Sequence, residues 1–147
     1  KEPETETYSY ERAVKRCNVA MLTEMVTGGK ISESAYLCLK LAWIYRGEIQ
    51  EAKANGAAQE RISVYKRYEK EYLEDAYRGF KQARETEYPP IAGMDENTIT
   101  YLLTSIGIHC GKIDEARRYG SALLISRTAS MKLKNKTRDV LETIKKN

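Results

Sequence analysis

The chain of 147 residues repeats one helix pattern three times. Each copy has an apolar residue, two charged residues and a shared alanine, at Ala13, Ala76 or Ala116, followed four and seven positions later by small or apolar residues. These spacings place the residues on one face of a helix. Alanine on that face lets a neighbouring helix approach closely. The repetition predicts stacked helices, an architecture that usually presents a binding surface rather than a reaction centre.

Composition favours one helical domain. The chain has only three prolines, at positions 3, 89 and 90, so most of it can form long helices. Apolar residues make up 41%, enough for a core, and the 31% of charged residues fits exposed helix faces. We expect residues 1–7 to form a disordered tail and residues 8–147 to form a single all-α domain.

Helix-starting and helix-ending residues divide this domain. Ser32 and Asp95 are suitable N-caps, and Tyr88-Pro89-Pro90 should end the preceding helix. The predicted helices cover about 8–26, 32–54, 57–87, 95–110, 113–126 and 135–145, with a polar, basic loop before the last one. The second and third helices would form one elongated antiparallel pair.

The cysteines do not indicate a disulfide framework or a metal centre. Cys17, Cys38 and Cys110 are odd in number and far apart, which favours a reducing, cytoplasmic compartment. His109 adjoins Cys110, but neighbouring residues on a helix point about 100° apart and no Cys-x-x-Cys pair is present. We therefore expect no metal, no cofactor and, because no apolar stretch approaches about 20 residues, no membrane contact.

The sequence also carries no recognisable catalytic motif. Glu69, Glu71, Glu74 and Asp75 could suggest acid–base or di-metal carboxylates, but lysines and arginines interleave with them. That pattern is typical of a solvated, ion-paired helix face. There is no Gly-x-Ser-x-Gly nucleophile motif and no phosphate-binding glycine loop. We expect a protein that is not an enzyme.

Residues 32–126 resemble the tetratricopeptide repeat. Ala76-x-x-x-Phe80-x-x-Ala83 matches its second-helix signature, and Gly111-Lys-Ile-Asp-Glu-Ala116 resembles its turn and second-helix opening. The resemblance implies antiparallel helix pairs stacked as a short right-handed superhelix. The long interval before Ala76 implies that one pair is elongated. Gly120 stands where the repeat usually has a bulky residue, which should weaken that contact.

Residues 10–120 are similar, more specifically, to the helical part of DUF2225, a bacterial family of unknown function. The similarity is carried chiefly by Leu39-Lys-Leu-Ala-Trp-Ile-Tyr-Arg46 and by Gly93-Met-Asp-Glu96. Members similar to this chain carry a Cys-rich segment, typical of metal binding, before the helices. The chain begins at Lys1 without it, so the resemblance implies a missing N-terminal segment. It implies no biochemical activity.

A tetratricopeptide-like architecture implies a concave groove lined by the first helix of each pair. The corresponding residues here are Tyr36, Lys40, Trp43, Arg46, Tyr101 and His109. An aromatic side chain flanked by cations can hold an acidic or C-terminal peptide. Trp43 also lies within the most apolar run of the chain, where large aromatic residues usually pack in the core. Both interpretations of Trp43 remain open.

Positive charge is concentrated at the C-terminal end. Residues 121–147 carry a net charge of +5, against −1 for the remainder. The candidate basic surface consists of Arg127, Lys132, Lys134, Lys136 and Arg138. These residues could neutralise nucleic-acid phosphates, but no aromatic residues interleave for base stacking. A solvated cap at the end of a helical stack explains them better, so nucleic-acid binding by this chain is the less favoured interpretation.

Together these features predict a cytoplasmic, non-catalytic protein–protein interaction or scaffold module with a protein or peptide partner. Two alternatives remain. The chain could be the assembly domain of a nucleic-acid-associated regulator, or a homo-oligomerisation module that covers its exposed apolar surface with a second copy.

Overall fold

A computed structural model describes residues 30–145 as five α-helices. The helices are α2 (Ile31–Ala54), α3 (Gln59–Thr86), α4 (Glu96–His109), α5 (Ile113–Leu124) and α6 (Met131–Lys145). The all-α prediction is therefore confirmed. The only β-type pairing within 30–145 is a single bridge between Ile91 and Met94. The predicted helix over 8–26, with Ala13 and Cys17, lies outside the described residues.

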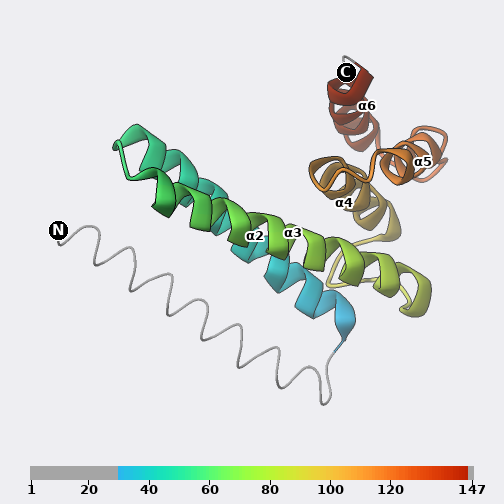
Figure 1. The fold of residues 1–147 in the computed structure, drawn as a ribbon. Helices are drawn as coiled ribbons and strands as arrows, with labels where there is room; N and C mark the ends of the chain where they lie inside the picture. The colour runs from blue at the N-terminus through green and yellow to red at the C-terminus, as the bar shows by residue number, and fades with distance from the viewer. Residues whose placement is uncertain (1–29, 146–147) are drawn as a thin grey trace.

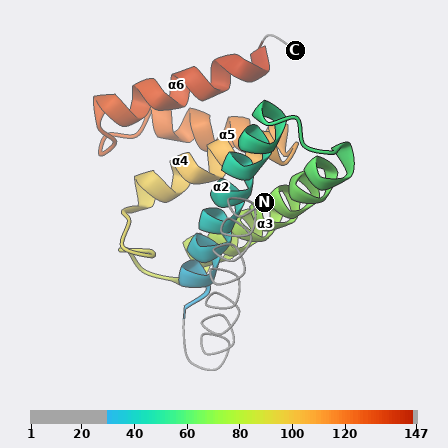
Figure 2. The same ribbon diagram turned by 90° about the vertical axis from the view of Figure 1, so that its left-hand side faces the viewer.

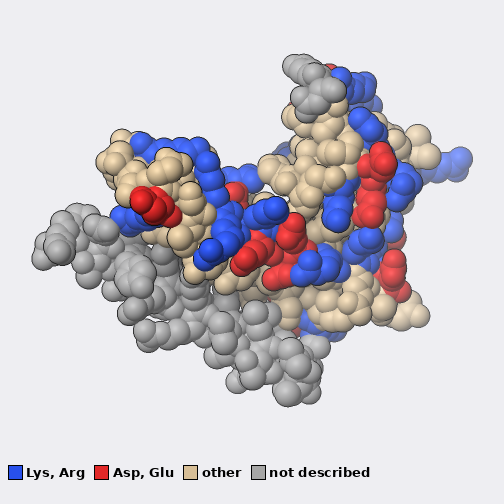
Figure 3. Space-filling view, viewed as in Figure 1, with Lys and Arg blue, Asp and Glu red and all other residues tan. Residues whose placement is uncertain are grey.

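The helices form a long pair and a shorter block. α2 and α3 run antiparallel along their whole length, and α4, α5 and α6 gather over the C-terminal half of α3 (Figures 1 and 2). Within the block, α6 packs against both α4 and α5. The outer end of the long pair extends past the block, and the surface is hollowed between the two (Figure 3). The prediction of an elongated helix pair is confirmed.

Small residues make the close helix contacts possible. Ala76, Ala83 and Ala116 have no exposed surface. A side chain at Gly79 would place its Cβ 2.7 Å from the Cβ of Ala35, so α2 and α3 touch almost backbone to backbone there. The predicted role of alanine at Ala76 and Ala116 is confirmed.

Gly120, where the repeat resemblance led us to expect a weak contact, lies against Leu141 of α6. A Cβ at Gly120 would lie 2.9 Å from a methyl group of Leu141. The bulky side chain is thus supplied by α6, and the glycine on α5 makes room for it. The repeat pattern describes one helix and contains no information about the helix packed on it, so it did not predict the contact with Leu141.

One predicted helix start is confirmed and one is wrong. Asp95 caps α4, its carboxylate accepting the Thr98 N–H at 2.8 Å. Ser32 lies inside α2, and Lys30 occupies the N-cap position without a side-chain hydrogen bond. Ser32 instead donates from its N–H and its hydroxyl to the Glu87 carboxylate, at 3.1 and 2.6 Å. The first turn of α2 is therefore capped by a residue at the end of α3.

The last helix begins earlier than predicted. α6 starts at Met131 rather than near residue 135, so the predicted loop over 131–134 is helical. Ser130 explains the start, because its Oγ accepts the Leu133 N–H at 3.1 Å. Thr137 is fully buried and donates its hydroxyl to the Leu133 carbonyl at 2.8 Å. This cap, rather than the basic composition, decides where the helix begins.

Candidate partner-binding site

The first part of the predicted groove lies on the outer face of α2. Tyr36, Lys40 and Trp43 follow one another at spacings of four and three, so they share one stripe of the helix. Trp43 exposes 50% of its surface, in contrast to the neighbouring Ala42 and Tyr45, which are buried and expose only 1%. The structure thus places Trp43 on the surface, and its interpretation as a core residue is wrong.

The cations beside Trp43 differ in availability. Arg46 donates from Nε to the Glu69 carboxylate on α3 at 2.7 Å, so its charge is already compensated. Lys40 forms no ion pair with a carboxylate in residues 30–145, and its Nζ lies 5.3 Å from the centre of the Tyr36 ring. Lys40 is therefore the cation of this face that can meet an acidic group.

A pocket of about 550 Å³ opens at the N-terminal end of the same face. Tyr36 and Leu37 contribute one wall from α2, and the loop after α3 contributes Pro90, Ala92 and Gly93. Its volume falls within the ~300–1,000 Å³ range of ligand pockets. Lys30 and Glu33 also line it. The sequence analysis missed the loop side of this pocket, because nothing local indicates that the loop returns to α2.

A tight turn fixes the loop wall. Ile91 and Met94 exchange backbone hydrogen bonds of 2.8 and 3.0 Å. Ala92 and Gly93 between them have positive φ values of 51° and 78°. Ile91 exposes only 1% of its surface and belongs to the core shared by α2, α3 and α4. The turn is therefore anchored, and the pocket keeps its shape without a ligand.

The second part of the predicted groove lies elsewhere. No Cα atom of α4 comes within 8 Å of one in α2. Tyr101 on α4 instead faces α6, with Lys136 Nζ 5.5 Å from its ring centre. His109 is exposed, and its Nδ1 lies 2.9 Å from the Ser105 carbonyl oxygen. The six predicted groove residues thus divide between two surfaces, one on α2 and one on α4 with α6.

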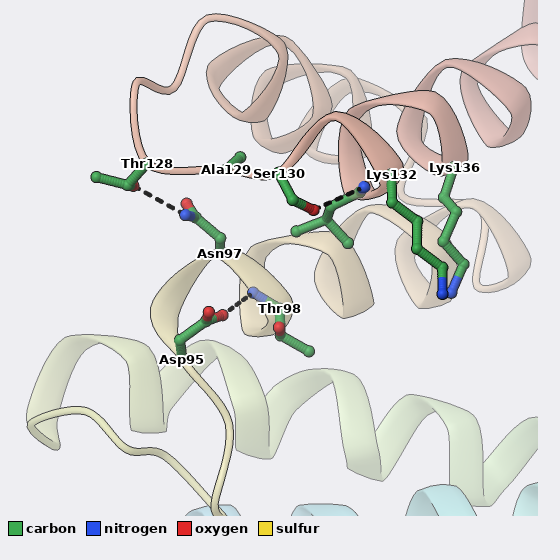
Figure 4. Close-up of a pocket in the computed structure, with 9 residues that line it drawn as sticks. Asp95, Asn97, Thr98, Thr128, Ala129, Ser130, Lys132 and Lys136 are labelled. Atoms are coloured by element: carbon green, nitrogen blue, oxygen red, sulfur yellow. Dashed lines mark hydrogen bonds between the residues drawn. The ribbon is translucent and has the colours of Figure 1, made fainter.

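A second, smaller pocket of about 210 Å³ lies between the starts of α4 and α6 (Figure 4). Two residues of the predicted basic surface line it, Lys132 and Lys136. The other three do not: Arg138 donates to the Asn135 side chain at 2.9 Å, Lys134 is half-buried, and Arg127 is exposed. The remaining lining residues are Asp95, Asn97, Thr98, Thr128, Ala129, Ser130 and Leu133.

The acidic stretch of α3 has the ion pairs expected of a solvated face. Asp75 pairs with Arg78 one turn further along, and Glu69 pairs with Arg46. Glu71 is exposed. In residues 30–145, no three His, Cys, Asp or Glu side chains are grouped so as to hold a metal ion. The structure therefore gives these carboxylates a surface role in this part of the chain.

The thiols in the described residues are held protonated. Burial raises the pKa of Cys38 to about 11, and burial likewise raises the pKa of Cys110. A thiolate is the form that attacks electrophiles or binds metals, so burial disfavours the reactive form of both side chains. Within the same residues, no helix is both long and apolar enough to span a bilayer.

Comparison with known proteins gives one match. Neither curated proteins nor solved structures include one that matches the chain. The model of one protein family, described as an uncharacterized protein conserved in bacteria, matches residues 3–144. That match covers almost all of the sequence, including the helices described above except the last residue of α6. The chain therefore belongs to the DUF2225 family.

Proposed function

We propose that this protein is a non-catalytic interaction module that binds a protein partner through the outer face of α2. The observation that carries the proposal is the exposure of Trp43, 50% of whose surface faces solvent. Tryptophan is highly buried on average and is enriched among the residues that dominate binding energy. Its neighbours on the stripe, Tyr36 and Lys40, add an aromatic surface and a cation that has no carboxylate partner within residues 30–145.

The face also indicates the chemistry of its partner. The 550 Å³ pocket beside Tyr36 can take an apolar anchor side chain. Lys40 favours an acidic residue near that anchor, since its charge has no carboxylate partner in the described residues. We expect a segment with an apolar anchor and an acidic residue, lying along α2 from the pocket to Trp43.

Several features support a binding role over catalysis. The strongly shifted pKa values belong to Cys38 and Tyr77, which are buried between helices and do not line either pocket. Catalytic groups are usually shifted where substrate can reach them. The cysteine composition fits a cytoplasmic location, which we include in the proposal.

Site-specific crosslinking in the native host tests the proposal. A photoreactive amino acid replaces Trp43 in the full protein, and the matched control places it at Val64, an exposed apolar residue of α3. We expect a crosslinked second protein from position 43 and none from position 64. Lys40→Ala in the same protein should reduce the yield several-fold. Equal crosslinking from both positions, or none from position 43, would refute the α2 face as the binding surface.

The same experiment separates the two alternatives. A crosslinked species of twice the chain's mass, containing only this protein, would identify the homo-oligomerisation module. Crosslinking to nucleic acid would support the assembly domain of a nucleic-acid-associated regulator. Either result would replace the heterologous partner as the principal function.

A further inference from the structure

The pocket between α4 and α6 has a prebuilt polar rim. Asn97 at the start of α4 donates to the Thr128 hydroxyl at 2.9 Å, which ties the loop before α6 to α4 (Figure 4). Ser126 Oγ accepts the N–H groups of Thr128 and Ala129, both at 3.2 Å. The loop is thus held in one conformation by hydrogen bonds to both sides. The pocket does not have to be assembled by a ligand.

Two lysines line this pocket, and neither is ion-paired with a carboxylate in residues 30–145. Lys132 and Lys136 are four residues apart on α6, and their side chains run in the same direction toward α4 (Figure 4). Lys136 is held over the ring of Tyr101 at 5.5 Å. Like charges at this spacing repel each other. An anion bound between the two ammonium groups would offset this repulsion by attracting both.

Asp95 on the opposite wall does not neutralise the lysines. Its carboxylate accepts the Thr98 N–H at 2.8 Å, and that hydrogen bonding lowers the pKa of Asp95, so it is ionised at neutral pH. A negative group at this wall disfavours a second anionic group beside it. The pocket therefore suits one compact anion near the lysines and disfavours a chain of successive phosphates.

We infer that this pocket binds a single phosphate group, with Lys132 and Lys136 as its cationic ligands. Its lining contains lysines and hydroxyl groups but no arginine. Lysine binds phosphate as a point charge, and hydroxyl groups can donate hydrogen bonds to phosphate oxygens. The volume of about 210 Å³ is below the ~300 Å³ at which drug-sized ligand sites begin. The site is distinct from the α2 face and does not depend on the proposed function.

Isothermal titration calorimetry of the full chain with inorganic phosphate, at constant ionic strength, tests this inference. We expect saturable binding that Lys132→Ala with Lys136→Ala weakens at least tenfold. The matched control is Lys66→Ala with Lys70→Ala, an exposed lysine pair of the same spacing on α3, which should leave the affinity unchanged. No saturable binding, or equal losses in both double variants, would overturn the site.

Asp95→Asn gives an independent test with the opposite sign. Asparagine retains the helix cap but removes the negative charge, so phosphate should bind several-fold more tightly. An unchanged affinity would place the anion outside this pocket and overturn the assignment. Circular dichroism checks that each variant is folded, and Lys132→Gln with Lys136→Gln provides a second lysine pair if the alanines disturb α6.

Two further titrations identify the source of the phosphate. A short phosphoserine peptide that binds at least tenfold more tightly than inorganic phosphate would assign the pocket to a modified protein. Equal affinities would assign it to a small phosphate-bearing molecule. Both results support a phosphate site. A DNA duplex that binds more tightly than either, through the same two lysines, would overturn the single-phosphate inference in favour of nucleic acid.

Discussion

The two halves of the long helix pair are packed by different kinds of residue. Where α4 covers it, the core between α2 and α3 combines alanines with larger side chains, among which Phe80 is fully buried. In the outer half, where α2 and α3 are the helices in contact among residues 30–145, tyrosines fill the space. The ring centre of Tyr45 lies 5.8, 5.2 and 6.0 Å from those of Tyr65, Tyr68 and Tyr72.

The difference reflects how many helices share each core. Three helices can enclose small residues and still exclude water, so close backbone approach is favoured at the covered end. Two helices alone leave their seam open at both sides, and long aromatic side chains are needed to cover it. The outer half should therefore be the more easily opened part of the pair.

The largest expected effect is at the covered end. Phe80→Ala should lower the free energy of unfolding by about 3–5 kcal/mol, because the cavity lies inside a fully enclosed core. Urea denaturation measures the change, with Val64→Ala as an exposed control. A loss below about 1 kcal/mol would mean that the three-helix core is not as tightly packed as described.

A smaller and local loss is expected in the outer half. Tyr65→Ala should cost about 2–3 kcal/mol, less than a fully enclosed aromatic residue, because Tyr65 lies in a core only two helices thick. Hydrogen exchange should show faster exchange in the outer turns of α2 and α3 while the turns around Phe80 stay protected. Uniform acceleration along both helices would show that the two halves open as one unit.

Two glycine-to-alanine substitutions should change the stability of the fold in opposite directions. Gly79→Ala should destabilise by about 1 kcal/mol, because overpacking against Ala35 outweighs the gain in helix propensity. Gly47→Ala, at a position on α2 where a Cβ meets nothing within 4 Å, should stabilise by about 0.5–1 kcal/mol. Thermal and urea denaturation of both variants measure the effects. Stabilisation by both would contradict the close approach at Gly79.

An effect of similar size concerns a polar contact between α3 and the short block. Tyr77 donates its hydroxyl to Glu115, and Lys81 Nζ pairs with the same carboxylate at 3.1 Å. These hydrogen bonds lower the pKa of Glu115, and burial raises the pKa of Tyr77. Tyr77→Phe should cost about 1 kcal/mol at pH 7.

The pH dependence of that cost follows from the lowered pKa. A carboxyl with a lowered pKa stabilises the fold above its unfolded pKa, about 4.3 for glutamate, and this contribution is lost as the pH falls through the folded value. The difference between wild type and Tyr77→Phe should therefore shrink between pH 5 and pH 3, as measured by denaturation at each pH. A constant difference would exclude Glu115 as the partner.

Local signals in the sequence predicted much of this architecture. The alanines at 76 and 116, the Asp95 cap and the end of α3 before Pro89 were all predicted from neighbouring residues, because each depends on the geometry of one helix. Features that join distant residues were missed. The Glu87 carboxylate that caps α2 is 55 residues from Ser32, and Leu141 fills the space left by Gly120 from another helix.

The candidate sites follow the same division. The face containing Tyr36, Lys40 and Trp43 was predicted from the resemblance to tetratricopeptide repeats. Its separation from Tyr101 and His109 was not, since it depends on how α4 crosses α3. The basic residues were identified by composition. That Lys132 and Lys136 share a pocket depends on the loop that Asn97 holds against α4, which the sequence does not indicate.

The bond between Ser32 and Glu87 has a practical consequence. It brings the first turn of α2 together with Glu87, directly after α3, so the α2–α3 hairpin begins and ends at the same place. An element whose two ends meet can be spliced into a surface loop of a carrier protein without stretching either chain. At about 1.5 Å per residue, α3 would then hold a tag roughly 40 Å from the carrier.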